Sequence, residues 1–414
     1  MVQDHNIPQG YKQTELGIIP EDWEVKTIAS LGNIVGGGTP STIIPAYWDG
    51  GIQWFTPAEI GASKYISKSE RSISKLGLQS SATRILPKDA ILLTTRASIG
   101  LSAILLNEAT TNQGFQSIIV NTKHCNEYVY YALKTKVTEM LTLASGSTFA
   151  EISKAKLANI KLSIPPIAEQ RAIAEALSDV DGLIAALDKK IAKKRLLKQG
   201  AMQQLLTGKK RLHGFTDEWV KITFGDYVDI YRGGSPRPIE NYITDNPNGV
   251  NWIKIGDVKP NDKYINKTEE RIIPDGVSRS RRVDVGDFIL SNSMSFGRPY
   301  ILGIDGCIHD GWLVIQNYHN TFDKDYLYYL LCSEDVMMQY MGMAAGSSVK
   351  NLNKEKVASL QLCMPTTIEE QQTIATILSD MDKEIADLEA QRDKYRLLKS
   401  GMMQKLLTGQ IRLK

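Results

Sequence analysis

AEQRAIAEALSDVDGLIAALDKKIAKKRLLKQGAMQQLLTGKKRL (residues 168–212) decides the fold of this 414-residue chain, because the same pattern occurs twice. The second copy is EEQQTIATILSDMDKEIADLEAQRDKYRLLKSGMMQKLLTGQIRL (residues 369–413). The copies align without a gap, each residue lying 201 positions after its counterpart, and both keep LSD, RLLK, LLTG and RL. A repeat period of about half the chain indicates a tandem duplication.

Each copy is predicted to form one long helix. Apolar residues recur at alternating spacings of four and three, which is the a/d pattern of a coiled coil. Roughly 40 helical residues would span about 60 Å. Pro165, Pro166 and Pro365 precede the helices and Gly208 and Gly409 follow them, as suits a helix start and stop. A single core helix in each of two ordinary domains is the alternative, and the length and strict heptad argue against it. The predicted seam consists of Ile173, Leu177, Val180, Ile184, Leu187, Ile374, Leu378, Met381, Ile385 and Leu388.

We expect the two helices to pair antiparallel. In a parallel, in-register pair like charges would meet, for example Arg195 and Arg396. If one helix is reversed so that Ile173 lies level with Leu406, opposite charges meet instead. The expected neighbours are Lys189, Lys190, Lys193 and Lys194 with Glu384, Asp387 and Glu389, and Asp179 and Asp181 with Lys399 and Arg396. The predicted arrangement is a pseudo-twofold antiparallel pair with a globular body at each end.

The composition is that of an ordinary globular protein. The formal net charge of +3 excludes neither nucleic acid nor any other partner, so the argument must rest on local charge. Four cysteines without CxxC spacing, together with five histidines, indicate neither a disulfide framework nor a zinc site. No apolar run is long enough to cross a membrane, and the polar start MVQDHNIPQGYKQ is unlike a signal peptide. We therefore expect a cytoplasmic protein.

The duplication extends beyond the helices. Residues 20–41 resemble residues 216–237, and DAILLTTRASIG (residues 89–100) resembles DFILSNSMSFG (residues 287–297). Further segments correspond in the same order, while the residues between them differ. This pattern predicts one scaffold that carries two sets of variable surface residues.

The predicted fold class is α+β, with two similar α/β bodies separated by the two long helices. Each body is expected to be a curled antiparallel sheet with a few helices. The predicted strands include residues 90–94, 117–120, 288–290 and 312–315, and the predicted amphipathic helices are residues 127–143 and 325–341. The predicted boundaries are 1–163 for the first body, 164–209 for the first helix, 210–363 for the second body and 364–414 for the second helix, with a linker at 206–218.

No catalytic constellation is found. The Gly-rich runs at residues 36–40 and 233–236 match neither a P-loop nor a dinucleotide-binding fingerprint, and a turn between strands is the simpler interpretation. The Asn/Asp-Pro-Pro-aromatic motif of base-modifying methyltransferases is absent from the sequence. Residues 20–26 (PEDWEVK) contain acidic groups and a lysine, but the spacing is too tight for a nuclease, and a strand is expected there. We therefore expect a binding protein and not an enzyme.

The loops of both bodies are rich in the residue types that contact phosphates and base edges in DNA. Any one of them alone could be a solvated loop residue, but they recur at matching places in the two copies. The candidate DNA-binding residues are Thr39, Ser41, Thr95, Arg96, Ser98, Asn112 and Gln113 in the first body, and Ser235, Arg237, Arg281, Asn292, Ser295, Arg298 and His309 in the second. Thr94, Ser293 and Asp310 lie in the same loops.

These residues and motifs resemble those of the specificity (S) subunits of type I DNA restriction–modification systems. The resemblance covers essentially the entire chain. The segments that carry it are YKQTELGIIPEDWEVKTIASLG (residues 11–32), ILLTTRASIG (91–100), TNQGFQSI (111–118), PPIAEQRAIAEAL (165–177) and RLLKQGAMQQLLTGKKRL (195–212). The second body departs from this pattern in SNSMSFGRP (residues 291–299), where Met294 replaces Ala97 and the arginine lies later.

The resemblance implies two target-recognition domains, each reading one half of a split site in double-stranded DNA. It also implies that the coiled coil sets the gap between the half-sites and docks two methyltransferase (M) subunits, which restriction (R) subunits join. S-adenosylmethionine, ATP and Mg would be bound by those partners, with no cofactor and no catalysis in this chain. Two alternatives remain: a coiled-coil scaffold that never contacts nucleic acid, and a standalone DNA-modifying enzyme, which the missing methyltransferase motif disfavours.

Overall fold

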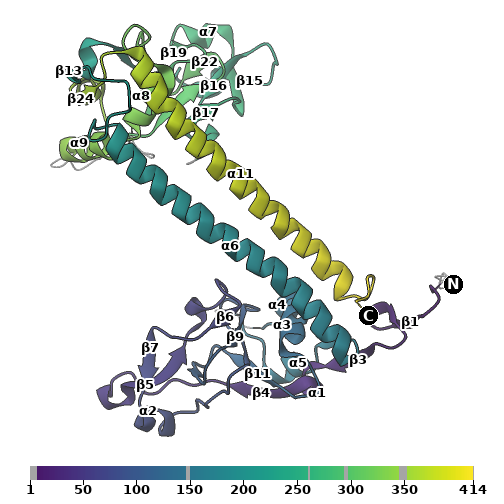
Figure 1. Cartoon of the computed structure of the whole chain (residues 1–414). Helices are drawn as coiled ribbons and strands as arrows, with labels where there is room; N and C mark the ends of the chain where they lie inside the picture. The colour runs from purple at the N-terminus through teal and green to yellow at the C-terminus, as the bar shows by residue number, and fades with distance from the viewer. Residues whose placement is uncertain (1–6, 146–149, 260–261, 293–296, 345–351, 414) are drawn as a thin grey trace. The chain divides into compact units, whose positions relative to one another are not determined.

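The computed structural model describes residues 7–145, 150–259, 262–292, 297–344 and 352–413. The chain forms two compact units, here called the first unit (residues 1–187 and 391–414) and the second unit (residues 188–390). The division falls inside both long helices, so each unit contains one body and a part of each helix (Figure 1). None of the described helices is both long and apolar enough to span a lipid bilayer.

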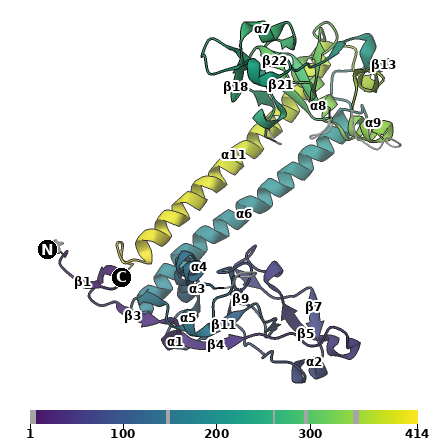
Figure 2. The same cartoon turned by 180° about the vertical axis from the view of Figure 1, so that it is seen from behind.

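The two long helices are α6 (Ile167–Leu205) and α11 (Ile368–Leu406), and each has 39 residues. At 1.5 Å per residue each helix is about 58 Å long. Gly208 and Gly409 follow the helices with φ values of 66° and 74°, a backbone conformation that favours glycine and stops a helix. Both helices are shorter than the expected segments 164–209 and 364–414, because each begins a few residues later and ends a few residues earlier. Within each unit, the parts of the two helices that belong to it run side by side (Figures 1 and 2).

The helices pair antiparallel, as predicted. In the second unit, Lys194 lies 2.7 Å from Glu384 and Lys198 lies 2.5 Å from Asp382, so residue numbers rise along one helix and fall along the other. In the first unit, Lys399 contacts Asp181 at 2.5 Å. The expected pairs Lys194–Glu384 and Asp181–Lys399 are both present. Glu389, which we expected near the lysines, contacts Arg195 at 2.5 Å instead.

The seam residues lie along the facing sides of the helices and at their junctions with the bodies. Ile173 and Leu177 belong to the apolar core of the first unit, and Ile374 and Leu378 belong to that of the second. Val180, Ile385 and Leu388 are also buried, while Ile184, Leu187 and Met381 are partly exposed. The seam residues nearest each body are therefore also part of the apolar core of that body.

The body of the first unit contains a five-stranded and a three-stranded sheet. The larger has the order β4 (Gly32–Gly36), β11 (Gln116–Val120), β8 (Ile91–Leu93), β9 (Ser102–Leu105) and β6 (Tyr65–Ile66). The smaller has the order β10 (Thr110–Thr111), β5 (Trp48–Phe55) and β7 (Arg71–Ile73). Most pairs are antiparallel, but β6 runs parallel to β9 and β10 runs parallel to β5. The prediction of an antiparallel sheet is therefore wrong in part, because long crossovers return β6 and β10 in the same direction as their neighbours.

The body of the second unit has two five-stranded sheets. The first has the order β14 (Asp229–Arg232), β23 (Trp312–Gln316), β20 (Phe288–Ser291), β21 (Pro299–Leu302) and β17 (Tyr264–Ile265). The second has the order β15 (Ile243–Thr244), β18 (Glu270–Ile272), β16 (Val250–Ile253), β22 (Gly306–Ile308) and β19 (Arg281–Val283). The five-stranded sheet of the first unit recurs strand for strand, including the parallel pair of β17 and β21. The structure therefore contains the duplication that the sequence predicts.

Each amphipathic segment that we predicted as one helix forms two. In the first unit these are α3 (Asn126–Lys134) and α4 (Val137–Leu143), and in the second they are α8 (Lys324–Leu331) and α9 (Glu334–Ala344). Ser333 Oγ accepts a hydrogen bond from the amide of Val336 at 3.3 Å, so it caps the start of α9. Met140 of α4 and Tyr340 of α9 are nevertheless buried.

A strand pair and a buried carboxylate join the first body to the start of α6. Strand β3 (Glu24–Thr27), expected from the motif PEDWEVK, pairs with β12 (Lys161–Ile164). Next to it, the Glu169 carboxylate accepts hydrogen bonds from Trp23 Nε1 at 3.0 Å and from Arg412 Nε at 2.7 Å. The side chain of Glu169 is only 4% exposed. This contact fixes residues that follow α11 onto the first body.

The second unit repeats this arrangement with strands β13 (Val220–Thr223) and β24 (Gln361–Met364). Glu370, whose side chain is 2% exposed, accepts two hydrogen bonds from Arg211, both at 2.9 Å, and one from Trp219 Nε1 at 3.3 Å. A buried carboxylate needs such partners, because desolvation without them is costly. These contacts explain why both repeats carry a glutamate near the start of the long helix.

Candidate nucleic-acid interface

Three loops of the first unit carry most of the candidate residues. We call them loop A (residues 37–41, after β4), loop B (94–101, between β8 and β9) and loop C (111–115, before β11). Loop A joins loop C through the amide of Gly38, which donates to Thr111 O at 2.9 Å. Loop B joins loop C through the amide of Thr95, which donates to Gly114 O at 2.8 Å. The three loops therefore form one hydrogen-bonded set.

The second unit holds its loops with the same hydrogen bonds. Its loop A (233–237) joins loop C (308–312) through Gly234, whose amide donates to Ile308 O at 3.1 Å. Its loop B (291–298) joins loop C through Asn292, whose amide donates to Gly311 O at 3.1 Å. Loop B also accepts a matching hydrogen bond in each unit. The amide of Ile152 donates to Thr95 O in the first unit, and the amide of Leu352 donates to Asn292 O in the second, both at 3.0 Å. The two units thus share one backbone frame.

The Gly-rich runs make this frame possible. A Cβ atom on Gly37 would lie 1.9 Å from Asn112 O, and one on Gly233 would lie 2.1 Å from His309 O. Both distances are far below contact distance, so only glycine lets loop A approach loop C so closely. The Gly-rich runs therefore do more than form a turn between strands, because they allow the close contact between loops A and C.

In the first unit one hydrogen bond joins two candidate side chains at loop C. Thr39 Oγ1 donates to Gln113 Oε1 at 2.5 Å, and Asn112 Oδ1 accepts from the amide of Gly114 at 2.8 Å. Arg96 is exposed and forms an ion pair with Glu151 at 3.0 Å. Ser41 and Ser98 are exposed, and Thr95 is buried. The exposed amide of Gln113 and the guanidinium of Arg96 are groups that can contact base edges in the major groove.

In the second unit Asp310 is the centre of the loops. Its carboxylate lies 3.2 Å from Ser235 Oγ, 3.3 Å from Arg237 and 3.0 Å from His309 Nε2. Its backbone carbonyl accepts from Asn292 Nδ2 at 3.1 Å. Three candidate residues therefore converge on one carboxylate, and a fourth contacts the backbone carbonyl of the same residue. The guanidinium side chain of Arg237 is 81% exposed, which leaves it free to reach a ligand.

Three candidates lie apart from this cluster. Arg281 is exposed on β19, where its guanidinium lies 4.8 Å from the centre of the Tyr231 ring. Arg298 follows Gly297 and corresponds by its hydrogen-bonded frame to Leu101 of the first unit, not to Arg96. Its neighbours are the helix residue Lys198 and the tyrosines of α8, with which it lines a cavity. Ser295 falls outside the described residues.

The carboxylates that organise the loops are the functional residues that the sequence does not reveal. The sequence places Asp310 in a loop but does not identify it as the acceptor for its neighbours, and it does not single out Glu151. The signal for Glu151 was weak, because its isolated backbone bridge to Arg96 joins segments 55 residues apart. Among the described residues there is no cluster of three or more metal-ligating side chains.

The chain belongs to the family of type I restriction modification DNA specificity domains, whose model matches residues 20–194 and again residues 216–395. The MjaIX specificity subunit of Methanocaldococcus jannaschii is 44% identical over 178 residues, a match that spans 42% of this chain and 41% of that relative. The MjaVIII specificity subunit of the same organism is 24% identical over 96% of this chain and 94% of its own.

Solved structures share the fold. A type I restriction-modification S subunit from M. genitalium covers 98% of both chains with a TM-score of 0.57 and 15% identity. A chain from a study of complex assembly and conformational transition of the type I R-M system covers 95% of this chain and 99% of its own, with a TM-score of 0.64 and 16% identity. The chain is therefore a type I restriction–modification specificity subunit with two recognition domains in tandem.

Proposed function

We propose that each recognition domain of this chain reads one half of a bipartite site in double-stranded DNA. The observation that carries the proposal is the shared loop frame, in which matching backbone hydrogen bonds hold unlike side chains. Ser41, Asn112 and Gln113 occupy the frame in the first unit, where the second has Arg237, His309 and Asp310 at the corresponding positions. Two unlike readers on one frame suit two different half-sites.

The helix pair would separate the two readers and so set the gap between the half-sites. A pseudo-twofold protein on duplex DNA addresses half-sites at a spacing that its own geometry dictates. The proposed domain boundaries stay at 1–163, 164–209, 210–363 and 364–414, so that the helices are spacers and the bodies are readers. We place the protein in the cytoplasm, where it meets genomic DNA.

We further propose that the helices dock two methyltransferase subunits. The RLLK motif of each helix has two exposed leucines. In α6 Leu196 and Leu197 are 68% and 50% exposed, and in α11 Leu397 and Leu398 are 75% and 51% exposed. Adjacent leucines this exposed at repeated positions are typical of a protein interface. Their repetition favours two copies of one partner. Those partners and the restriction subunits that join them would bind S-adenosylmethionine, ATP and Mg, while this chain reads DNA without catalysing a reaction.

A binding measurement with duplex DNA tests the reading function. The site is first mapped as the methylated bases that appear in host DNA when this gene is present and vanish when it is deleted. The purified chain, alone and with co-expressed M subunit, is then titrated against that duplex at 50 to 200 mM salt. We expect affinity to fall with salt, because phosphate contacts release counterions, and to rise with the M subunit. A scaffold that does not bind DNA would show neither effect.

The absence of catalysis is tested separately. The purified chain is incubated with DNA and labelled S-adenosylmethionine, without any partner. We expect no label in the DNA unless M subunit is added. Label transferred by this chain alone would show that it is an enzyme in its own right.

A further inference from the structure

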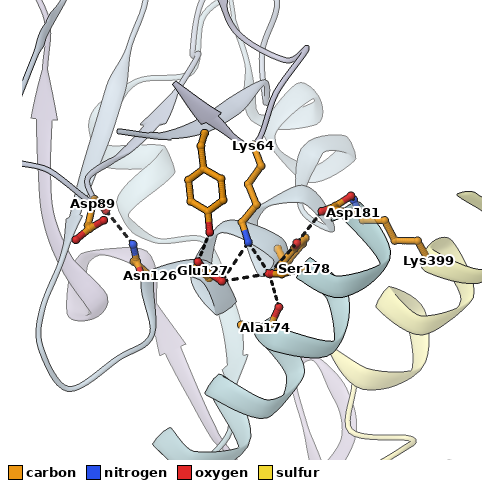
Figure 3. A network of polar contacts seen from close by, with 10 residues as sticks. Lys64, Asp89, Asn126, Glu127, Ala174, Ser178, Asp181 and Lys399 are labelled. Carbon is orange, nitrogen blue, oxygen red and sulfur yellow. Dashed lines mark hydrogen bonds and ion pairs between the residues drawn. The ribbon is translucent and has the colours of Figure 1, made fainter. Parts of the chain in front are cut away.

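A network of polar side chains ties the first body to both long helices (Figure 3). Lys64, just before strand β6, donates to Ser178 Oγ of α6 at 2.6 Å and to Glu127 Oε2 of α3 at 3.1 Å. Tyr65 of β6 also donates to the Glu127 carboxylate. Ser178 Oγ lies 3.2 Å from that carboxylate, so the helix and the body share one set of hydrogen bonds.

The network continues from α6 to α11. Asp181 accepts from Tyr131 of α3 at 2.7 Å and from Lys399 of α11 at 2.5 Å (Figure 3). Lys399 Nζ also lies 5.4 Å from the centre of the Tyr131 ring. One aspartate therefore connects a helix of the body to a lysine that the second repeat supplies. This is a three-part junction within a single unit.

The groups in this junction are shielded from water. The Lys64 side chain is 9% exposed, and the Lys399 and Asp181 side chains are 18% and 26% exposed. Burial works to raise the pKa of Glu127, but hydrogen bonds from Tyr65 and Lys64 outweigh it and hold that pKa below its usual value. Shielded, hydrogen-bonded ion pairs fix geometry more firmly than exposed ones do.

The second unit builds the same junction from the corresponding residues. Asp382 of α11 accepts from Tyr329 of α8 at 2.7 Å and from Lys198 of α6 at 2.5 Å. Lys263, before strand β17, donates to Asp325 of α8 at 2.8 Å. In each unit the aspartate comes from one repeat and the helix lysine comes from the other.

The junction lies close in the sheet to a reading loop. Strand β6 pairs with β9, and β9 begins directly after loop B of the first unit. In the second unit β17 pairs with β21, which follows loop B in the same way. A rotation of the body on the helices would therefore carry loop B with it, because the sheet between them is hydrogen-bonded.

We propose that these two junctions, centred on Asp181 and Asp382, are positioning devices that fix the angle of each recognition domain on the helix pair and thereby the half-site spacing that the protein accepts. The inference rests on the proposed reading of a bipartite site. It assigns Tyr131, Tyr329, Lys399 and Lys198 a role in spacing without contact to DNA. Base preference within each half-site belongs to the loops and is independent of the junctions.

The test compares Asp181→Asn, Asp382→Asn and the milder Tyr131→Phe in the complex with M subunit. The probes are duplexes with the two mapped half-sites separated by the native number of base pairs, or by one or two more or fewer. The spacing preference is the ratio of the affinity for the native spacing to the affinity for an altered spacing. We expect this ratio to be above one in the wild type and at least fivefold smaller in each variant. Single-base changes within a half-site should reduce binding by the same factor in variant and wild type.

Asp393→Asn is the matched control. It removes a helix carboxylate whose ion-pair partners, Arg392 and Arg396, lie on its own helix, so the spacing preference should stay at the wild-type value. A junction variant that binds all spacings more weakly by one common factor, with the native preference intact, would show a merely structural role and overturn the inference. A wild type with no spacing preference at all would instead refute the proposed bipartite reading itself.

A distance measurement gives a readout that does not need DNA. Spin labels on non-natural residues at positions 79 and 185, both exposed and both within the first unit, report the angle of the body on α6. We expect a broader distance distribution in Asp181→Asn and Tyr131→Phe than in the wild type and in Asp393→Asn. Identical distributions in all four proteins would also overturn the inference.

Discussion

The two units have the same backbone frame but different side chains on it. Both need a glycine at the start of loop A, both bind loop B to loop C through one amide, and both bury a glutamate at the start of the long helix. The side chains that project from the frame share almost no identity. Positions where backbone meets backbone are thus alike in the two units, and positions where side chains reach outward are free to differ.

The loops also differ in charge. In the first unit Arg96 is paired with Glu151, whereas in the second Arg232 and Arg237 both contact Asp310, one at its carbonyl and one at its carboxylate. Arg281 adds a further exposed cation on β19. We therefore expect the second domain to contribute more to the salt dependence of DNA binding.

The largest expected effect comes from the buried glutamates. Glu169→Ala and Glu370→Ala each leave an arginine without its main partner, which should cost about 3 to 5 kcal/mol of stability in the affected unit. Arg412 keeps Asp22 at 2.7 Å, whereas Glu370 is the only carboxylate paired with Arg211 among the described residues, so Glu370→Ala should cost more. Amide hydrogen exchange under urea, read separately for each unit, measures both. The exposed Glu175→Ala is the control and should change stability by less than about 0.5 kcal/mol.

The second effect concerns the glycines of loop A. Gly37→Ala and Gly233→Ala force loop A away from loop C, because the new Cβ would meet a backbone carbonyl. Each should weaken DNA binding through its own half-site by about 2 kcal/mol, roughly thirtyfold. Competition with duplexes that carry only one intact half-site separates the two. Gly182→Ala, in open space on α6, should leave binding unchanged; equal loss at both half-sites in either loop variant would contradict a local effect.

The third effect tests the exposed arginines. Arg96→Ala should weaken binding through one half-site only, by about 1 to 3 kcal/mol, and Arg237→Ala should do so through the other. Titration against duplexes with single-base changes shows whether selectivity relaxes at one position. If Arg96→Ala weakens binding equally on all sequences, Arg96 contacts phosphate and does not read a base.

The smallest effect is a difference in pH dependence. Burial and the charge of Lys26 lower the pKa of His124 in the first unit, and the buried Phe322 occupies the corresponding place in the second. As the pH falls, His124 is therefore protonated at a higher pH in the unfolded chain, where its pKa is about 6.5, than in the folded chain. Stability of the first unit should fall as the pH drops below about 6.5, and His124→Phe should remove this dependence. Urea midpoints from pH 7.5 to 5.5 measure it, and an unchanged slope in His124→Phe would assign the pH dependence to another group.

Much of the fold follows from the sequence because the helical repeat is long and regular. A heptad over several turns predicts helix α6 and α11, and opposite charges such as Lys194 and Glu384 predict the antiparallel pairing. The breaks before α4 and α9 could not be predicted from periodicity, since the apolar pattern continues across them. The parallel strand pairs also escaped prediction, because β6 and β17 are only two residues long and gain their place from the sheet.

The candidate site was predicted less completely than the fold. Loops A, B and C were found because polar residues recur at matching positions in both repeats. The roles of Glu151 and Asp310 depend on contacts between segments far apart in the chain, which a single sequence does not reveal. The position of the Arg298 side chain could not be predicted from the sequence either. Gly297 belongs to the shared frame, but the side chain of Arg298 lies beside α8. Whether each candidate contacts DNA stays a prediction.

The first unit contains residues from both ends of the sequence, which has a consequence for biosynthesis. Leu406, Leu407 and Leu413 pack into the core of the first unit, together with Met402 and Met403. About 200 residues separate the end of α6 from these side chains, so at 5–20 residues per second the ribosome needs roughly 10 to 40 s to supply them. The first domain to be synthesised is therefore the last to be completed, and a premature stop late in the message would damage the domain encoded at its beginning.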